Sequence, residues 1–289
     1  MSRSMRTRIK ACVPSAFRRE SRRWLRRINN AALGAPLTES EFSGILEYRL
    51  GIKAGDTVLV HCSFGALKAT FSAEEALGIL QERVGPDGSI IMPCYPGNGE
   101  EWLRSGKSFD PLTTPIATGI LAQTLSRSKD ARVSIHPIKA VAAWGMHKDA
   151  ITADHQYSLT PFDRNSPYTR LLTLPHAKAI GLATAKMTFY HCCEDAVPEM
   201  VDLLYTPEAL PGYFVTGDGG VLPVPTRVHR TEVLDRMPSS YDVLTGSGCP
   251  GYRVFRHRHR FFYVADLPVV HEHVRTLLTS RSDIPVRAV

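Results

Sequence analysis

The residues with the clearest chemical potential are a histidine and a glutamate in the segment TFYHCCE, residues 188–194. An apolar run over residues 177–183 precedes this segment and predicts a buried strand. Thr188 is then a suitable N-cap for the helix that follows, which puts His191 and Glu194 three residues apart on one helical face. The spacing therefore brings an imidazole and a carboxylate together.

Such a pair has the properties of a general base. A histidine in the first turn of a helix feels the positive end of the helix dipole, which favours its neutral form, and the carboxylate can fix its tautomer. A neutral imidazole accepts a proton near neutral pH. A solvated histidine and glutamate at an ordinary helix start would share this spacing, so the assignment depends on the rest of the chain.

Further motifs follow one another along the chain. They are VHCSFGAL (60–67), GPDGSIIMP (85–93), FDP (109–111), TP (114–115), SIHP (134–137), AAWG (142–145), ITADH (151–155) and PFDRNSP (161–167). In this order they resemble the aminoglycoside 3-N-acetyltransferase family, over about residues 38–275. The ordered set is far more specific than any single motif.

The resemblance implies an enzyme that moves the acetyl group of acetyl-CoA, or the acyl group of another acyl-CoA, to an amine on a sugar ring. It also implies that Thr188, His191 and Glu194 correspond to the family's catalytic threonine, histidine and glutamate. We expect direct transfer, with His191 as the general base. Glu194 would either orient His191 or contact the ammonium group of the substrate.

The chain departs from the family pattern at four positions. Val133 stands where the family usually has an arginine, Ile116 where it has a serine, and Asp163 where many members have a glycine. After the strand histidine the second serine is kept as Ser63, but the first is Cys62. These changes affect polar contacts to the acyl donor and the acceptor, and leave the histidine and glutamate in place.

The acyl donor is expected to bind where the chain bends after a strand. The segment from Ser63 to Ala66 can turn sharply at Gly65 and present backbone N–H groups to pantetheine or pyrophosphate, and Lys68 is near enough to meet a phosphate. The predicted donor-binding residues are His61, Ser63, Phe64, Gly65, Ala66, Lys68, Thr114 and Ser134.

The acceptor is expected to contact His136, Asp163 and Glu194. For His136 a structural role in capping a turn is an equal alternative. No metal is predicted, because the chain lacks a His-Glu-x-x-His motif and a Cys-x-x-Cys pair.

Three other functions fit parts of the sequence. Cys192 and Cys193 beside His191 could form an acyl-enzyme, since a helix start lowers a thiol pKa. A zinc hydrolase could use His155, His191 and Cys192, although no zinc motif supports it. The chain could also be a membrane-associated scaffold with a decayed site, for which Val133 and Ile116 are weak support.

The alternation of strand and helix patterns predicts an α/β fold, a layered α/β/α sandwich around a mixed sheet. The chain has 289 residues, of which 43% are hydrophobic, enough for one large domain over residues 36–280 with tails at 1–35 and 281–289. After Tyr205, turn-rich segments predict a small hairpin-like excursion over the site. Residues 253–263 resemble one exposed edge strand, followed by a helix over residues 264–278.

The net charge of +7 belongs to the N-terminal tail. Residues 1–30 hold ten lysines or arginines and one acid, so the rest of the chain carries 25 basic and 27 acidic residues, a net charge of −2. Phe17, Trp24, Leu25 and Ile28 would form an apolar stripe on a helix flanked by arginine. This pattern favours an anionic membrane surface. A helix packed on the body, nucleic acid or another partner are the alternatives, and an organellar transit peptide would share the composition.

Cysteine usage and charge bear on location and substrate. The six cysteines show no disulfide framework, and no apolar run approaches membrane-spanning length, so we expect a cytoplasmic protein, peripheral on the inner face of the membrane if the tail binds there. No nucleic acid partner is expected for the body, and an oligomer is left open. A nearly neutral body argues against a polycationic substrate and for an amino sugar of glycan biosynthesis, with an aminoglycoside antibiotic as the alternative.

Overall fold

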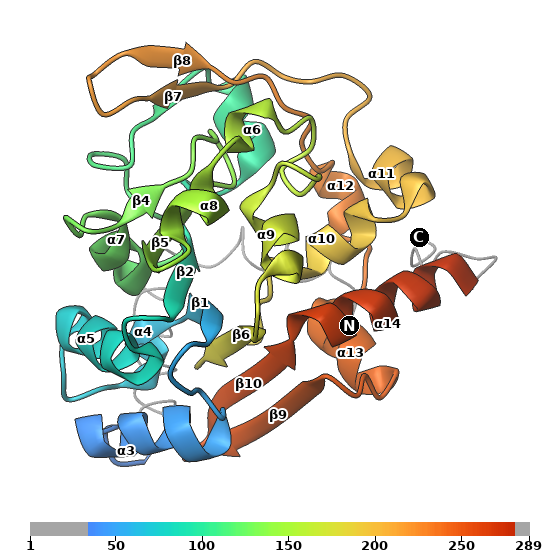
Figure 1. Ribbon diagram of the computed structural model, residues 1–289. Coiled ribbons are helices and arrows are strands. Elements are labelled where there is room, and N and C mark those ends of the chain that lie inside the picture. The colour runs from blue at the N-terminus through green and yellow to red at the C-terminus, as the bar shows by residue number, and fades with distance from the viewer. Residues whose placement is uncertain (1–33, 281–289) are drawn as a thin grey trace, which may run out of the picture.

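A seven-stranded mixed sheet organises residues 34–280, the part of the chain that the computed structural model describes (Figure 1). Its strand order is β4-β5-β2-β1-β6-β10-β9. Central β1 pairs in parallel with β2 and β6, while the outer pairs are antiparallel. The strands are β1 (Thr57–Cys62), β2 (Ser89–Pro93), β4 (Arg132–Val133), β5 (Val141–Gly145), β6 (Ala177–Leu182), β9 (Tyr252–His257) and β10 (Arg260–Asp266).

Helices cover both faces of this sheet. One face packs against α3 (Glu39–Gly44), its continuation η1 (Ile45–Arg49), α5 (Ala73–Val84) and α7 (Ile120–Ser126). The other face packs against α8 (Lys148–Thr152), α9 (Pro167–Arg170), α10 (Tyr190–Asp195) and α14 (Leu267–Ser280). The remaining helices are α4 (Phe64–Leu67), α6 (Gly99–Arg104), η2 (His155–Tyr157), η3 (Leu171–Thr173), α11 (Pro198–Leu204), α12 (Thr231–Leu234) and α13 (Ser240–Gly246). The predicted α/β/α sandwich is confirmed.

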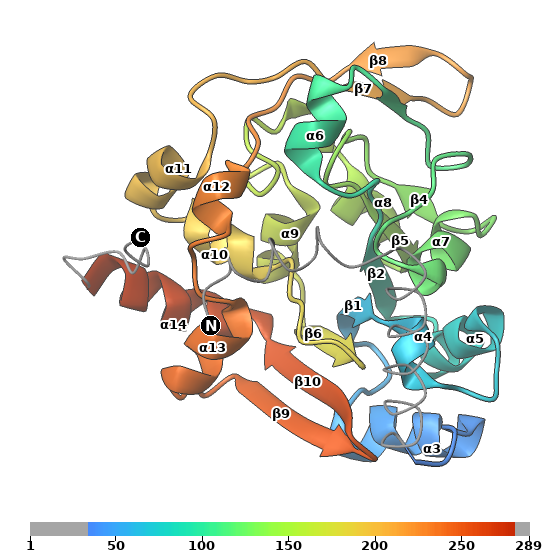
Figure 2. The ribbon, with the colours of Figure 1, turned by 180° about the vertical axis from the view of Figure 1, so that it is seen from behind.

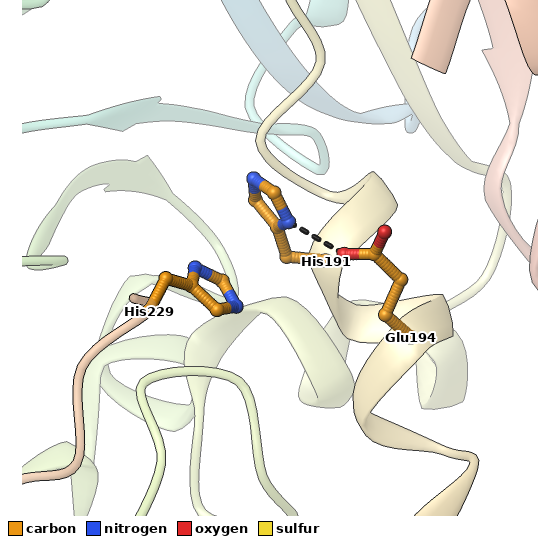
Figure 3. A group of neighbouring side chains, drawn as sticks. All are labelled: His191, Glu194 and His229. Carbon is orange, nitrogen blue, oxygen red and sulfur yellow. Dashed lines mark hydrogen bonds and ion pairs between the residues drawn. The ribbon is translucent and has the colours of Figure 1, made fainter. Parts of the chain in front are cut away.

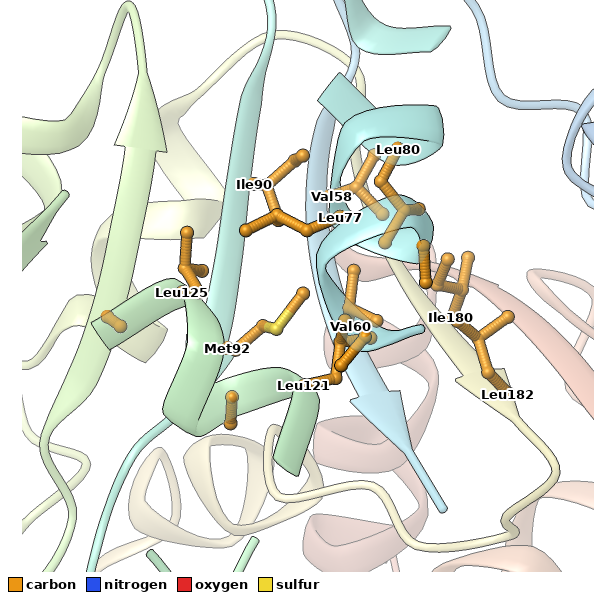
Figure 4. Close-up of a cluster of buried hydrophobic side chains, with 14 of the residues drawn as sticks. Val58, Val60, Leu77, Leu80, Ile90, Met92, Leu121, Leu125, Ile180 and Leu182 are labelled. Carbon is orange, nitrogen blue, oxygen red and sulfur yellow. The ribbon is translucent and has the colours of Figure 1, made fainter. Parts of the chain in front are cut away.

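The core is divided because successive residues of a strand point to opposite faces. In β1, Val58 and Val60 pack with α5 and α7, whereas Leu59 packs in the second cluster on the other face. Figure 4 shows the first cluster, in which Leu77 and Leu80 of α5 cover the valines. The central strands are buried on both faces, which is why the sequence shows continuous apolar runs there instead of strict alternation.

Two helices begin with the capping-box pattern, in which a threonine or serine is followed three residues later by glutamate, at Thr38 and at Ser72. The Thr38 hydroxyl accepts the Glu41 N–H at 3.3 Å while the Glu41 carboxylate accepts the Thr38 N–H at 3.1 Å. Ser72 and Glu75 repeat the exchange at the start of α5, at 3.1 Å and 2.6 Å. These bonds satisfy backbone donors that a helix start otherwise leaves free.

The predicted edge strand over residues 253–263 is instead a hairpin. Arg258 and His259 adopt left-handed backbone conformations with φ of 46° and 64°, and they reverse the chain between β9 and β10. Strand β9 forms the edge of the sheet, as expected, but β10 pairs with β6 inside it. The helix predicted from residue 264 therefore begins at Leu267, because residues 264–266 continue β10.

The predicted excursion after Tyr205 contains a hairpin of β7 (Tyr213–Val215) and β8 (Val221–Pro223), which β3 (Ser108–Phe109) extends to a second sheet. Figures 1 and 2 view the molecule from opposite sides, and both show this sheet at the end away from α3. The expectation that the hairpin covers the site is wrong in detail. The segment that reaches α10 is the return chain from His229 to Tyr241.

Within residues 34–280, no helix combines the length and the apolar character that crossing a membrane requires. The predicted basic amphipathic helix and the C-terminal tail at 281–289 lie outside the described residues. The domain limits at 36 and 280 stay a prediction.

Ser72→Ala removes the hydroxyl that caps α5. We expect the free energy of unfolding to fall by about 1 kcal/mol, because the Glu75 N–H loses its acceptor. Urea denaturation followed by circular dichroism measures this change. Ser128→Ala, at a loop serine outside any helix cap, is the matched control, and equal stability of the two variants would contradict the capping role.

Candidate active site

The predicted histidine and glutamate meet on α10. His191 Nδ1 lies 2.7 Å from Glu194 Oε2 (Figure 3). The Glu194 side chain is 3% exposed and that of His191 25% exposed, so the carboxylate is fixed in the interior while the imidazole reaches the surface of a cleft. With Nδ1 bonded to Glu194, His191 Nε2 is the nitrogen left for a substrate.

Thr188 does not cap α10 as predicted. The N-cap residue is Phe189, and it makes no side-chain cap bond. Thr188 instead lies in the preceding turn, where its carbonyl accepts the His191 N–H at 3.2 Å. Its hydroxyl lies 3.4 Å from the Tyr95 hydroxyl, beside the space into which a substrate could enter.

A buried histidine holds this turn in place. His61 Nε2 accepts the Thr188 N–H at 2.9 Å, so its proton is on Nδ1, which lies 3.0 Å from the Tyr263 hydroxyl. That hydroxyl donates to the Lys186 carbonyl at 2.8 Å. Burial lowers the pKa of His61 to about 3, so the ring is neutral above acidic pH and acts through hydrogen bonds instead of charge.

The Tyr263 ring reaches His61 by crossing directly over Gly181 of β6. A Cβ atom built on Gly181 would lie 2.1 Å from a carbon of this ring, closer than real atoms approach. The absence of a side chain at Gly181 therefore creates the space that the ring fills.

Two cavities meet beside Thr188. The larger, here the β1 cavity, has a volume of about 630 Å³, and the other, here the α10 cleft, has about 500 Å³. Tyr95, Lys186 and Thr188 line both. His191 and Glu194 face the α10 cleft, so a group that crosses from one cavity to the other passes the imidazole.

Four of the predicted donor-binding residues line the β1 cavity, namely His61, Ser63, Phe64 and Gly65. Ala66 lies within α4 outside the lining, and Lys68 is exposed just beyond it. Lys139 and Lys186, which sequence reasoning did not single out, bring positive charge to this cavity. Lys139 lies over the Tyr95 ring, 4.3 Å from its centroid.

Ser134 and His136 form internal contacts and do not line either cavity. The Ser134 hydroxyl is 2.9 Å from His155 Nδ1, and His136 Nδ1 accepts the Lys139 N–H at 3.1 Å. His136 thus caps a turn, the alternative that the sequence left open. Burial holds the pKa of His136 well below its usual value and lowers that of His155 to about 3.

Thr114 and Asp163 also organise turns. The Thr114 hydroxyl accepts the Asp110 N–H at 3.0 Å. The Asp163 carboxylate accepts N–H groups of Leu159 and Asn165 at 2.7 and 2.9 Å. Neither residue lines the two cavities. The side chains of both are hydrogen-bonded to backbone N–H groups of their own loops.

The geometry does not favour the cysteine and zinc alternatives. Cys192 and Cys193 are buried in the core behind α10. Burial raises the pKa of Cys192 to about 12 and holds that of Cys193 well above its usual value, so both thiols stay protonated. Cys192 Sγ lies 3.2 Å from Thr169 Oγ1, while His155 is bonded elsewhere. The alternative zinc set of His155, His191 and Cys192 therefore does not form.

Sequence reasoning missed a second histidine at the site. The His229 ring centroid lies 4.5 Å from that of His191 and 4.1 Å from that of Tyr205. The residue is buried and lies in a segment without motif character, 38 positions after His191, so only the folded chain brings the two rings together. His229 lines a third space of about 260 Å³, here the side cavity, together with Glu100 and Asp235.

A partly buried acid next to the His191–Glu194 pair, Asp195, was also missed. Asp195 accepts the Tyr205 hydroxyl at 2.6 Å and the Thr160 hydroxyl. Burial raises its pKa to about 6, against the opposing effect of these two bonds. It anchors the end of α10 to Tyr205, and Tyr205 in turn supports His229.

Known proteins resemble the chain in sequence. A curated relative, the aminoglycoside N(3)-acetyltransferase IV of Salmonella sp, is 32% identical over 151 residues, which cover 50% of this chain and 54% of the relative. The aminoglycoside N(3)-acetyltransferase VII of Streptomyces paromomycinus is 26% identical over 162 residues, covering 50% and 56%. The chain thus spans about half the length of the curated relatives that it matches.

Solved structures share the fold. The aminoglycoside acetyltransferase AAC(3)-Xa superposes with a TM-score of 0.69 at 21% identity, over 87% of this chain and 96% of that one. A binary complex of AAC-IIIb with CoASH gives 0.66 at 18% identity, over 86% and 99%. The YokD protein from Bacillus subtilis gives 0.66 at 19% identity, over 85% and 100%.

A family model described as aminoglycoside 3-N-acetyltransferase matches residues 59–237, which include β1, the turn at Thr188, α10 and His229. This segment is more than half of the 289 residues. The chain therefore belongs to the aminoglycoside 3-N-acetyltransferase family.

Proposed function

We propose that the protein is a CoA-dependent N-acetyltransferase that acylates an amine of an aminoglycoside. The observation that carries this proposal is the His191–Glu194 pair in the α10 cleft, which meets the β1 cavity at Thr188. Family membership supports the same chemistry. An intact pair in an open cleft is not expected of a decayed scaffold.

Acetyl transfer by this pair follows a direct path. His191 Nε2 takes a proton from the acceptor amine as the amine nitrogen bonds to the thioester carbon. Glu194 holds the other ring nitrogen and stabilises the imidazolium. The carbon–sulfur bond then breaks, the CoA sulfur leaves with its electron pair, and the proton on His191 passes to it. The Thr188 hydroxyl is our candidate donor to the developing oxyanion, because it borders both cavities.

The acyl donor is assigned to the β1 cavity. His61, Ser63, Phe64 and Gly65 remain its proposed contacts, and their position at the end of a central parallel strand is typical of ligand sites in α/β sheets. Lys139 and Lys186 supply charge for the phosphates of CoA, and Lys68 is a further candidate outside the lining. Thr114 and Ser134 are hydrogen-bonded inside the protein, so we no longer propose them as contacts of the acyl donor.

The acceptor is assigned to the α10 cleft and the side cavity. The near-neutral net charge of the chain after residue 30 favoured an amino sugar of glycan biosynthesis as the acceptor. The affinity of a site for a cation, however, depends mainly on the charges close to it. Glu194 and Asp235 line the α10 cleft, and Glu100 and Asp235 line the side cavity. These three acids outnumber the two lysines that border the same spaces, Lys186 and Lys139, and the small acidic excess is compatible with a cationic acceptor. The relatives are named for aminoglycosides, which favours the same acceptor. A nucleotide- or lipid-linked amino sugar becomes the second candidate.

Release of free thiol from acetyl-CoA tests the proposal. We expect rapid release with aminoglycosides and slow release with nucleotide-linked amino sugars. His191→Ala should lower kcat by roughly 10² to 10⁴ with little change in donor affinity, because it removes the general base.

His176→Asn is the matched control for His191→Ala. This histidine is exposed at the other end of β6, and asparagine tolerates its left-handed backbone. Near-normal turnover in the His191 variant would exclude the base role, and release with amino sugars alone would exclude the aminoglycoside as acceptor.

Membrane association through residues 1–30 is proposed as an accessory property. The described chain begins beside the tip of the β9–β10 hairpin, where Arg258 donates to the Pro36 carbonyl at 3.3 Å and Arg260 to the Ala35 carbonyl at 3.0 Å. The adjoining edge strand exposes Arg253 and Arg256. The basic tail is thus attached next to a basic edge, and the two could bind one anionic surface.

Deletion of residues 1–30 should abolish binding to phosphatidylserine-containing vesicles at low salt and leave activity on a soluble amine unchanged, because the tail carries the surplus charge. Sedimentation with vesicles measures binding, with phosphatidylcholine vesicles as the control. Arg253→Gln combined with Arg256→Gln should weaken binding by roughly tenfold. If the full-length chain does not bind anionic vesicles, the proposal is ruled out.

A further inference from the structure

Three metal-ligating side chains converge at one point of the site. His191, Glu194 and His229 each offer one ligand atom, and these atoms all lie within 4.8 Å of one another. Figure 3 shows the edge of the His229 ring turned toward the helix that carries the other two. Two imidazole nitrogens and one carboxylate oxygen are a ligand set of zinc sites that keep a fourth position open.

His229 is the member that acetyl transfer does not use. Its backbone pairs with Tyr205 in an isolated bridge, and its ring packs between those of Tyr205 and His191. The residue is 6% exposed, and its Nε2 atom is buried with no hydrogen-bond partner among residues 34–280. A buried polar atom without a partner costs roughly 1–3 kcal/mol, which a ligand at that atom would offset.

The other two side chains of the cluster are already joined. His191 Nδ1 and Glu194 Oε2 lie 2.7 Å apart, and a metal ion bound to both atoms would take the place of the proton between them. Metal binding at this pair therefore releases a proton.

The burial of the cluster restricts what could bind there. His229 Nε2 has almost no accessible surface, which excludes a bulky ligand at this atom, while Glu194 and the partly exposed His191 line the α10 cleft and His229 lines the side cavity. A single small ion is therefore the occupant that fits. Bonds of about 2.0–2.1 Å set tetrahedral ligands about 3.3 Å apart. Small side-chain rotations would bring the more distant ligand atoms to this separation. They would also lengthen the 2.7 Å distance between His191 Nδ1 and Glu194 Oε2 by a few tenths of an ångström.

We propose that His191, Glu194 and His229 bind Zn²⁺ or a similar divalent transition-metal ion, with water in the open position facing the α10 cleft. The ion occupies the nitrogen and carboxylate of the proposed base, so it inhibits acetyl transfer. Metal binding itself does not depend on that activity and is measured without substrate.

Calorimetric titration of the full chain, first freed of metal with a chelator, with ZnCl₂ tests the site. We expect one ion to bind tightly to the wild type, and His229→Gln to weaken this binding by at least about tenfold, because it removes one ligand. Affinity should fall as pH is lowered, since protons compete for the ligands. Co²⁺ gives a second readout, as its visible spectrum reports tetrahedral nitrogen and oxygen ligation.

His273→Gln is the matched control, because this histidine is bonded to Ser247 away from the cluster. Glu194→Gln provides a second ligand variant if His229→Gln does not fold, as judged by circular dichroism. Unchanged Zn²⁺ affinity in a folded ligand variant, or no binding to the wild type, would overturn the proposal. In thiol-release assays, Zn²⁺ inhibition that persists undiminished in His229→Gln would also contradict it.

Discussion

The neutral imidazole of His61 joins the parts of the molecule on which the site depends. One nitrogen bonds to the Thr188 backbone and the other to Tyr263, so the end of β1, the turn before α10 and strand β10, which lies beyond β6 in the sheet, are fixed together. A charged histidine could not accept the Thr188 N–H. Burial keeps the ring neutral, and the hydrophobic core thereby preserves the hydrogen-bond direction that holds the turn.

Strand pairing determines where that anchor acts. β1 and β6 are parallel neighbours, with His61 opposite Gly181 and Cys62 opposite Leu182, so the chain leaves both strands at one edge of the sheet. One exit leads to the loop at Ser63 and the other to the turn at Thr188. The two proposed substrate cavities therefore meet at Thr188 because the sheet brings two loops together there.

Local signals in the sequence predicted much of the fold. The Thr38 and Ser72 capping boxes, the apolar strands and the His191–Glu194 pair depend on residues within a few positions of one another. The features that the sequence did not reveal depend on distant contacts. His229 reaches His191 only through tertiary packing, and Ser134 bonds to His155 inside the core. The turn at Arg258 and His259 lacks glycine, so its left-handed backbone had no sequence signature.

The close approach of Tyr263 to Gly181 extends the site beyond the residues that border it. Any side chain at position 181 would push the ring aside and loosen its bond to His61, and through His61 the turn before α10. A substitution at Gly181, which touches no substrate, would thus alter the position of the His191 imidazole. A smaller residue at position 263 would not make room for such a side chain, because the same Cβ would also lie 2.6 Å from the backbone oxygen of Thr184.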